Sequence, residues 1–193
     1  MEENLEIEFK SKLTQESHLL IRDYFPFESP IFQNNTYYDT PNSDLYREGT
    51  MCRVRKIGEE LLLTVKEPHP DGVMEYEIYI TGDIKSDPNS QKVLDVFNVN
   101  AQDLEEIAFS NTVRYEYKDV YGTWCLDVTQ FEFHKDYEIE YELHHEDKAA
   151  QKHYYQTLKS IGIEYEAIQP KFVRALNSKQ IRDEELSLQD SHS

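Results

Sequence analysis

A charged strand close to the N-terminus constrains the fold of this chain more than any other segment. Glu6-Ile7-Glu8-Phe9-Lys10 alternates charged and apolar side chains, and successive side chains of an extended strand point to opposite faces. Glu6, Glu8 and Lys10 therefore share one face, while Ile7 and Phe9 share the other. One strand of this kind is typical of an antiparallel sheet that has one face in water.

The same alternation returns in strand after strand, which changes that interpretation. The charged positions alternate with apolar neighbours such as Val54, Val65 and Ile139. If the apolar rows pack outward against helices, the charged rows face inward. Because isolated buried charges are very costly, such an interior must be wet, internally paired and occupied by ions. The charged positions after the first strand are Arg53, Arg55, Lys66, Glu75, Glu77, Arg114, Asp127, Glu138 and Glu140.

Hairpin signals at Gly58-Glu59 and Gly122-Thr123 connect these strands. The sequence therefore predicts an α+β fold, a closed eight-stranded antiparallel barrel with flanking helices, able to hold one small ligand. Strands are predicted at 4–12, 36–39, 50–57, 60–67, 73–80, 111–121, 124–132 and 135–144. Helices are predicted from Thr14 onward, as two short helices within 87–107 and at 146–161. A helical turn is predicted at 44–47, and a short helix or a turn at 170–176.

Length and composition limit the remaining possibilities. The chain has 193 residues, which fits one domain, predicted over residues 1–177, with a polar, acidic C-terminal tail over residues 178–193 that is expected to fray. A net charge of -18 disfavours nonspecific binding to nucleic acid or an anionic membrane. We find neither a membrane-length apolar run nor a signal peptide.

The strand phases place the two cysteines, Cys52 and Cys125, on faces that disfavour a disulfide. Unpaired thiols without a secretion signal predict a cytoplasmic protein. Because a closed barrel has no free strand edge, a monomer is expected, with a homodimer as the alternative.

The charged rows suit phosphoryl chemistry. Carboxylates are the hard oxygen ligands that Mg²⁺ or Mn²⁺ prefers, and Glu6, Glu8, Glu138 and Glu140 form a candidate site if their strands are neighbours. Arginine forks and lysine ammonium groups fit phosphate oxygens. Carboxylates with a divalent metal on one side and cations on the other are typical of enzymes that transfer or hydrolyse phosphoryl groups.

Together these motifs resemble the CYTH superfamily, the triphosphate tunnel metalloenzymes, which includes class IV adenylate cyclases and thiamine triphosphatases. The resemblance runs from Glu6 to about Arg174 and is greatest for small bacterial single-domain proteins of the bacillus type. Two positions depart from the pattern, since Val73 stands where many members have Arg, and Glu142 is in phase with the last Glu-x-Glu. The matching segments are Glu6-x-Glu8-x-Lys10, Tyr38-Asp39-Thr40-Pro41, Arg53-Val54-Arg55, Leu63-Thr64-Val65-Lys66, Glu75-Tyr76-Glu77, Arg114, Leu126-Asp127, Glu138-Ile139-Glu140 and Pro170-Lys171-Phe172-Val173-Arg174.

The resemblance implies an antiparallel tunnel that holds a triphosphate, and it implies roles for particular residues. The implied phosphate contacts are Lys10, Arg53, Arg55, Lys66, Arg114 and Lys171. The residues implied to bind metal or to position water are Glu6, Glu8, Asp127, Glu138 and Glu140. The predicted catalytic residues are Glu6, Glu8, Lys10, Glu138 and Glu140, and further site candidates are Glu75, Glu77, Glu142 and Arg174.

We therefore predict a triphosphatase that depends on Mg²⁺ or Mn²⁺ and hydrolyses inorganic tripolyphosphate or a small organic triphosphate such as thiamine triphosphate. In the predicted mechanism water attacks a terminal phosphoryl group in line. One metal bridges the substrate to Glu6, Glu8 or Glu140, and a second, weaker metal near Glu138 and Asp127 activates the water. Two alternatives stay open: a class IV-type adenylate cyclase that makes cyclic AMP from ATP, and a noncatalytic sensor that binds polyphosphate or a nucleotide.

Overall fold

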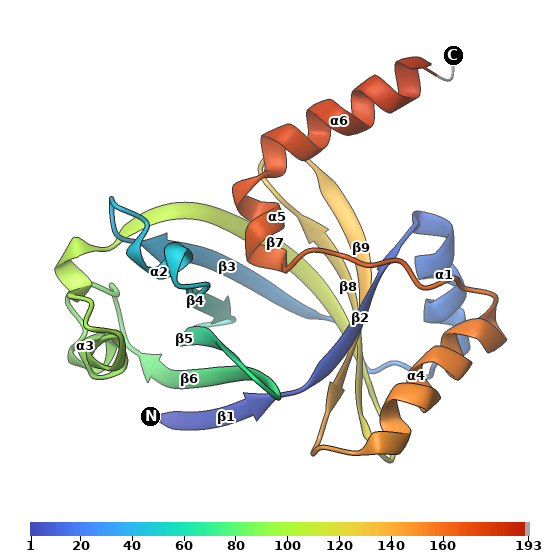
Figure 1. The fold of residues 1–193 in the computed structure, drawn as a ribbon, viewed down its shortest axis with the longest axis horizontal. Coiled ribbons are helices and arrows are strands. Elements are labelled where there is room, and N and C mark those ends of the chain that lie inside the picture. Colours follow the sequence, from blue (N-terminus) through green and yellow to red (C-terminus); the bar gives the residue numbers. More distant parts are fainter. Residues whose placement is uncertain (192–193) are drawn as a thin grey trace.

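The computed structural model describes residues 1–191 and contains one strongly curled antiparallel sheet of nine strands (Figure 1). The predicted α+β class, the antiparallel barrel-like sheet and the flanking helices are confirmed. The strands are β1 (Glu2–Glu6), β2 (Glu8–Leu13), β3 (Ile31–Asp39), β4 (Met51–Ile57), β5 (Glu60–His69), β6 (Gly72–Ile80), β7 (Glu105–Lys118), β8 (Gly122–Gln130) and β9 (Lys135–Leu143). The helices are α1 (Gln15–Tyr24), α2 (Asp44–Arg47), α3 (Pro88–Leu94), α4 (Lys148–Ile161), α5 (Lys171–Leu176) and α6 (Ser178–Ser191), with short 3₁₀ turns η1 (Asp95–Phe97) and η2 (Ala101–Asp103).

The sheet has nine strands instead of the predicted eight because the N-terminal strand is divided at Ile7. The order across the sheet is β1-β6-β5-β4-β3-β7-β8-β9-β2. β1 pairs with β6 at one end of this order, and β2 pairs with β9 at the other. The two edge strands of the curled sheet, β1 and β2, are therefore consecutive in the chain. Glu6 and Glu8 lie on either side of Ile7, where the two strands are divided.

The segment between α3 and β7 differs from the prediction. α3 forms where the first of two short helices is predicted, but η1 and η2 replace the second helix, and Ile107 lies within β7. β7 starts early because it pairs with β3, with Glu106 opposite Tyr38. This long-range pairing overrides the helical spacing of Leu104 and Ile107. β3 is also longer than predicted for the same reason.

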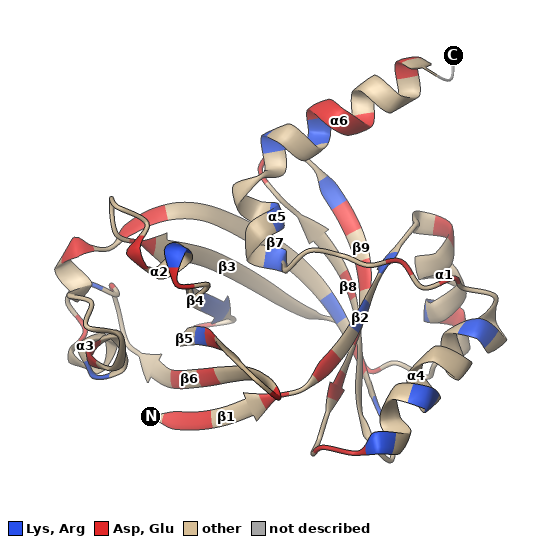
Figure 2. Ribbon diagram, viewed as in Figure 1, with Lys and Arg blue, Asp and Glu red and all other residues tan. Residues whose placement is uncertain are grey.

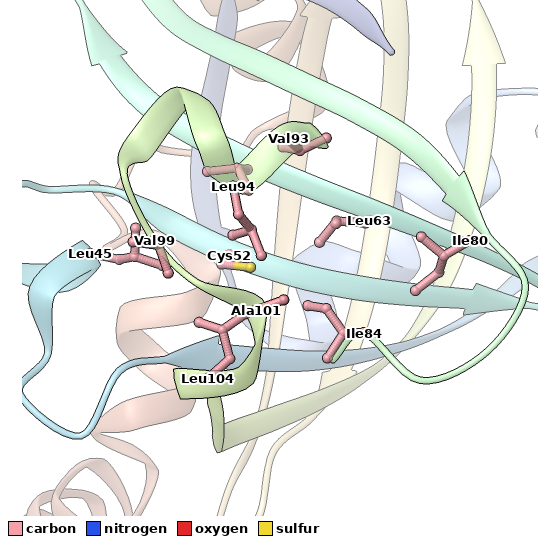
Figure 3. Close-up of a cluster of buried hydrophobic side chains, with 11 residues drawn as sticks. Leu45, Cys52, Leu63, Ile80, Ile84, Val93, Leu94, Val99, Ala101 and Leu104 are labelled. Carbon is pink, nitrogen blue, oxygen red and sulfur yellow. The ribbon is translucent and has the colours of Figure 1, made fainter. Parts of the chain in front are cut away.

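Helices cover the outer face of the sheet in two groups. Val93 and Leu94 of α3 pack with Cys52 and Leu63 in one apolar cluster, over β4 and β5 (Figure 3). α1 and α4 lie on the other side of the molecule (Figure 1), and their cluster joins Ile21, Tyr154 and Leu158 to Trp124, Leu126 and Ile139. The apolar rows thus face outward against helices, as predicted, and the charged rows lie on the inner face.

The Tyr38-Asp39-Thr40-Pro41 motif is a structural turn. The buried Asp39 carboxylate accepts hydrogen bonds from the backbone N–H groups of Thr40 (2.7 Å), Leu45 (3.0 Å) and Tyr46 (2.9 Å). The bonds from Leu45 and Tyr46 satisfy N–H groups at the start of α2 that have no partner within the helix. The two cysteines are unpaired, as predicted, and the structure shows that both are buried.

The C-terminal helices take different positions. Phe172 and Ala175 of α5 pack with Tyr37, Met51 and Phe131. α6 extends away from the sheet (Figure 1). The tail was predicted to fray, but it is helical over Ser178–Ser191. Residues 192 and 193 of that tail lie outside the described part of the chain. Within residues 1–191, no helix combines the length and the apolar character needed to cross a membrane.

Asp119, between β7 and β8, ties this hairpin to α4. Its carboxylate accepts hydrogen bonds from Trp124 Nε1 (2.9 Å) and from the Tyr141 hydroxyl, and it contacts His153 Nε2 at 2.8 Å. Burial alone would raise the pKa of Asp119, but hydrogen bonds from Tyr141, Trp124 and His153 lower it to about 2. The ionised carboxylate therefore stabilises the folded protein.

We expect Asp119→Ala to lower the free energy of unfolding by about 2–4 kcal/mol, because several donors lose their shared acceptor. The folded pKa lies below the ordinary value of 3.8, so this stabilisation is complete at neutral pH and is lost as the pH falls from about 4 towards 2. Urea denaturation of both proteins at pH 7 and pH 3 measures the difference. Asp23→Ala, at an exposed position of α1, is the control, and an equal loss in both variants would contradict the role of Asp119.

Candidate functional site

Strand pairing brings the predicted site residues together on the inner face, and Figure 2 shows acidic and basic positions along β1, β2, β6 and β9. Lys10 of β2 lies opposite Glu140 of β9, and the next inward pair is Glu8 with Glu142. Arg114 of β7 lies opposite Asp127 of β8. Residues far apart in the sequence therefore form one charged surface.

The first carboxylate cluster consists of Glu6, Glu8 and Glu142, at the break between β1 and β2. One oxygen from each residue lies within 4.8 Å of the others. Each carboxylate contacts a different cation: Glu6 contacts Lys66 Nζ at 2.6 Å, Glu8 contacts Lys10 Nζ at 2.8 Å, and Glu142 contacts Arg114 Nη1 at 2.9 Å. Three carboxylate oxygens at this spacing fit a divalent cation.

Burial raises the pKa of two carboxylates of this first cluster. Burial raises the pKa of Glu8 to about 7, with Glu140 and Glu6 adding to the rise and Lys10 opposing it. Burial also raises the pKa of Glu6, although Lys66 opposes the shift. A cation between these carboxylates would stabilise their ionised forms.

The second carboxylate cluster consists of Asp127, Glu138 and Glu140, all buried, with oxygens that again lie within 4.8 Å of one another. Arg114 donates to both oxygens of Asp127, at 2.8 and 2.7 Å, and also contacts Glu140. Lys171 Nζ lies 2.6 Å from Asp127 Oδ2, 2.7 Å from Glu138 Oε1 and 3.4 Å from Glu140 Oε1. This cluster therefore already has cations within contact distance of all three carboxylates.

Neighbouring cations outweigh burial at Asp127 and Glu140 of the second cluster, but not at Glu138. Burial would raise the pKa of Glu140, but Lys171 and Arg114 hold it well below its usual value. The same two cations lower the pKa of Asp127 against the effect of burial. Burial raises the pKa of Glu138 to about 7, although Lys171 opposes the shift.

Arg174 connects the second cluster to Asp136, a residue that was not among the predicted site residues. It contacts Glu138, and its Nη1 donates to Asp136 Oδ1 at 2.7 Å. Asp136 lies two residues before Glu138 and therefore on the same strand face, a signal already present in the sequence.

Glu75 and Glu77, the Glu-x-Glu motif of β6, belong to neither carboxylate cluster. Glu75 contacts Lys66 Nζ at 2.6 Å, while Glu77 accepts a hydrogen bond from Thr64 Oγ1 at 2.8 Å. Val73, where the sequence departs from the expected pattern, lies opposite Glu6. The middle strand therefore contributes one ion pair with a predicted phosphate-binding cation.

Arg53 and Arg55 differ from the other four predicted phosphate-binding cations, because within residues 1–191 neither has a carboxylate in salt-bridge contact. Arg53 donates from Nη2 to Thr64 Oγ1 at 3.4 Å, and its buried Nε has no hydrogen-bond partner in the described chain. Arg55 Nε donates to Asn35 Oδ1 at 2.9 Å. Burial, with Arg53 and Arg114 nearby, lowers the pKa of Arg55 to about 9. These two guanidinium groups are therefore available to an anionic ligand.

Comparisons with known proteins agree with this architecture. The CYTH domain model matches residues 4–173. A Bacillus subtilis (strain 168) protein named "Putative triphosphatase YjbK" is 27% identical over 150 residues, which cover 74% of this chain and 79% of that protein. Two solved structures also match most of the chain.

The crystal structure described as a "putative adenylate cyclase" from Bacillus halodurans has a TM-score of 0.78 and 24% identity, and the match covers 90% of this chain and 98% of that one. HpAC1 from Hippeastrum is described as a "putative adenylyl cyclase" with a dominant triphosphatase activity. It has a TM-score of 0.76 and 25% identity, and the match covers 91% of this chain and 96% of that one. Because the domain model spans nearly all of the curled sheet and its charged inner face, this chain belongs to the CYTH domain family.

Proposed function

We propose that this chain is a metal-dependent triphosphatase acting on inorganic tripolyphosphate or a small organic triphosphate. The observation that carries the proposal is the inward pair Arg53 and Arg55, which have no carboxylate partner in the described chain. Cations without an anion are costly in a protein interior, and phosphate oxygens supply both the charge and a bidentate geometry. The triphosphatase names of YjbK and HpAC1 support the same activity.

Glu6, Glu8 and Glu142 are the residues that would hold Mg²⁺ or Mn²⁺. Their oxygens are close enough to share one ion, and an all-carboxylate donor set suits these hard cations. The bound metal would offset the negative charge of the phosphates and polarise the scissile phosphoryl group.

The cations of the chain orient the substrate and stabilise the charge that develops on the terminal phosphoryl group. Arg53 and Arg55 contact the phosphate chain in this proposal. Lys66 Nζ contacts Glu6 and Glu75, both at 2.6 Å. Because an ammonium group has three donors, Lys66 can bind these carboxylates and a phosphate oxygen together. Lys10, which contacts Glu8, has donors to spare in the same way.

Product analysis tests this proposal against its alternatives. The pure protein is incubated with tripolyphosphate, thiamine triphosphate and ATP, each with Mg²⁺ or Mn²⁺, and phosphate, pyrophosphate and cyclic AMP are measured. We expect phosphate from at least one of the three and no cyclic AMP. Cyclic AMP with pyrophosphate from ATP would establish a cyclase, and tight binding of a triphosphate without any product would establish a sensor.

A further inference from the structure

The ammonium group of Lys171 lies among three buried carboxylates, where a divalent cation would otherwise fit. Its Nζ contacts Asp127, Glu138 and Glu140 at 2.6, 2.7 and 3.4 Å. The side chain of Lys171 is 11% exposed, and those of the three acids are 0%, 1% and 9% exposed. Lys171 donates hydrogen bonds to Asp127 Oδ2 and Glu140 Oε1, and its charge lies within salt-bridge distance of Glu138 Oε1.

Within residues 1–191, no cation lies at the centre of the first carboxylate cluster. Glu6, Glu8 and Glu142 each contact a different cation, and two of these cations are shared with other acids, since Lys66 also contacts Glu75 and Arg114 also contacts Asp127. Arg114 and Arg174 of the second cluster are likewise shared, with Glu142 and Asp136. The second cluster differs in Lys171, whose Nζ contacts all three of its acids. Three cations therefore face the three acids of the second cluster, and a further divalent ion there would meet strong repulsion.

Contacts along α5 hold Lys171 in this position. Arg174, one turn later, contacts Asp136 and Glu138. Phe172 packs in the apolar cluster with Tyr37. Ser178, at the start of α6, accepts a hydrogen bond from the Phe133 backbone N–H at 2.9 Å and contacts His134 Nδ1 at 2.8 Å. Withdrawal of Lys171 would leave three buried carboxylates with less compensation, which is unfavourable.

We infer that Lys171 takes the place of a second metal ion, so that the protein binds one divalent cation, at Glu6, Glu8 and Glu142. The inference rests on the proposed function for its metal, and it changes the predicted role of Lys171 from a phosphate contact to a fixed charge in the carboxylate cluster. Asp127, Glu138 and Glu140 then serve to hold Lys171 and Arg114 in place rather than to ligate metal.

Direct Mn²⁺ binding tests this inference, with free Mn²⁺ followed by electron paramagnetic resonance in the absence of any triphosphate. We expect one Mn²⁺ per wild-type chain, and two ions of similar affinity would overturn the inference. Hydrolysis is scored separately: two bound ions with turnover would leave the proposed function intact, while one bound ion without turnover would refute only the function.

Two sets of variants sharpen the test. Lys171→Met is expected to bind a second Mn²⁺ and to gain more thermal stability from Mn²⁺ than the wild type does, whereas the exposed control Lys12→Met stays at one ion. A stoichiometry of one in Lys171→Met would overturn the inference. If Lys171→Met does not fold, ligand variants decide: Glu8→Gln weakens Mn²⁺ binding by at least about tenfold, whereas Glu138→Gln does not. An equal loss in both would overturn the inference.

Discussion

Arg55→Met is expected to remove most triphosphatase activity while making the substrate-free protein more stable. Arg55 has no carboxylate partner in the described chain, and its pKa is lowered to about 9 by burial and by Arg53 and Arg114. Removing this cation relieves like-charge repulsion, so we expect a gain of about 1 kcal/mol in the free energy of unfolding. Loss of a preorganised charged donor to the phosphates should lower kcat/KM by about 10²–10³-fold.

The opposite signs of these two effects make the prediction specific. Thermal unfolding without substrate measures the first effect, and the initial rate of phosphate release from a triphosphate measures the second. Lys56→Met, at the neighbouring exposed position of β4, is the matched control and should change neither quantity much. A variant that is both inactive and less stable would show that Arg55 supports the fold rather than the substrate.

Glu8→Gln is expected to lower activity by about 10²-fold or more at low Mg²⁺, because one of three proposed metal ligands is lost. Since the pKa of Glu8 is raised by burial and by Glu140, the neutral side chain is compatible with the fold, and the unfolding temperature should not fall. Higher Mn²⁺ concentrations should restore part of the rate, because the remaining carboxylates still bind metal more weakly.

Glu3→Gln is the matched control for Glu8→Gln, since Glu3 is exposed on the opposite face of the same N-terminal segment. The measurement is the rate of phosphate release as a function of metal concentration for both variants. If Glu8→Gln keeps the wild-type rate and the wild-type metal dependence, the metal site lies elsewhere.

The period-two alternation was sufficient to predict which side chains face inward, because it depends only on local strand geometry. Alternation alone predicts that Lys10, Glu140, Arg114 and Asp127 all face inward. The strand register in the structure then places Lys10 opposite Glu140 and Arg114 opposite Asp127. The family resemblance added the expected roles of these residues, which alternation alone does not supply.

Long-range contacts were not predictable in the same way. The pairing of Lys66 with Glu6 depends on β1 closing against β6, and the position of Lys171 depends on α5 packing on the inner face. The predicted start of β7 was wrong because the pairing of β7 with β3 outweighs the weak helical spacing of Leu104 and Ile107. Neutral partners such as Asn35 and Thr64 carry no charge signal in the sequence. Only the structure therefore shows that, among residues 1–191, Arg53 and Arg55 have no acidic partner.

The most direct test of a metal-dependent triphosphatase is phosphorus NMR of tripolyphosphate with the wild type, Arg55→Met and Glu8→Gln, with Mg²⁺ and again with excess EDTA. We expect the wild type to convert tripolyphosphate to pyrophosphate and phosphate only when metal is present, and both variants to be strongly impaired. Tripolyphosphate that stays intact with the wild type and Mg²⁺, or equal turnover by all three proteins, would contradict the proposed function.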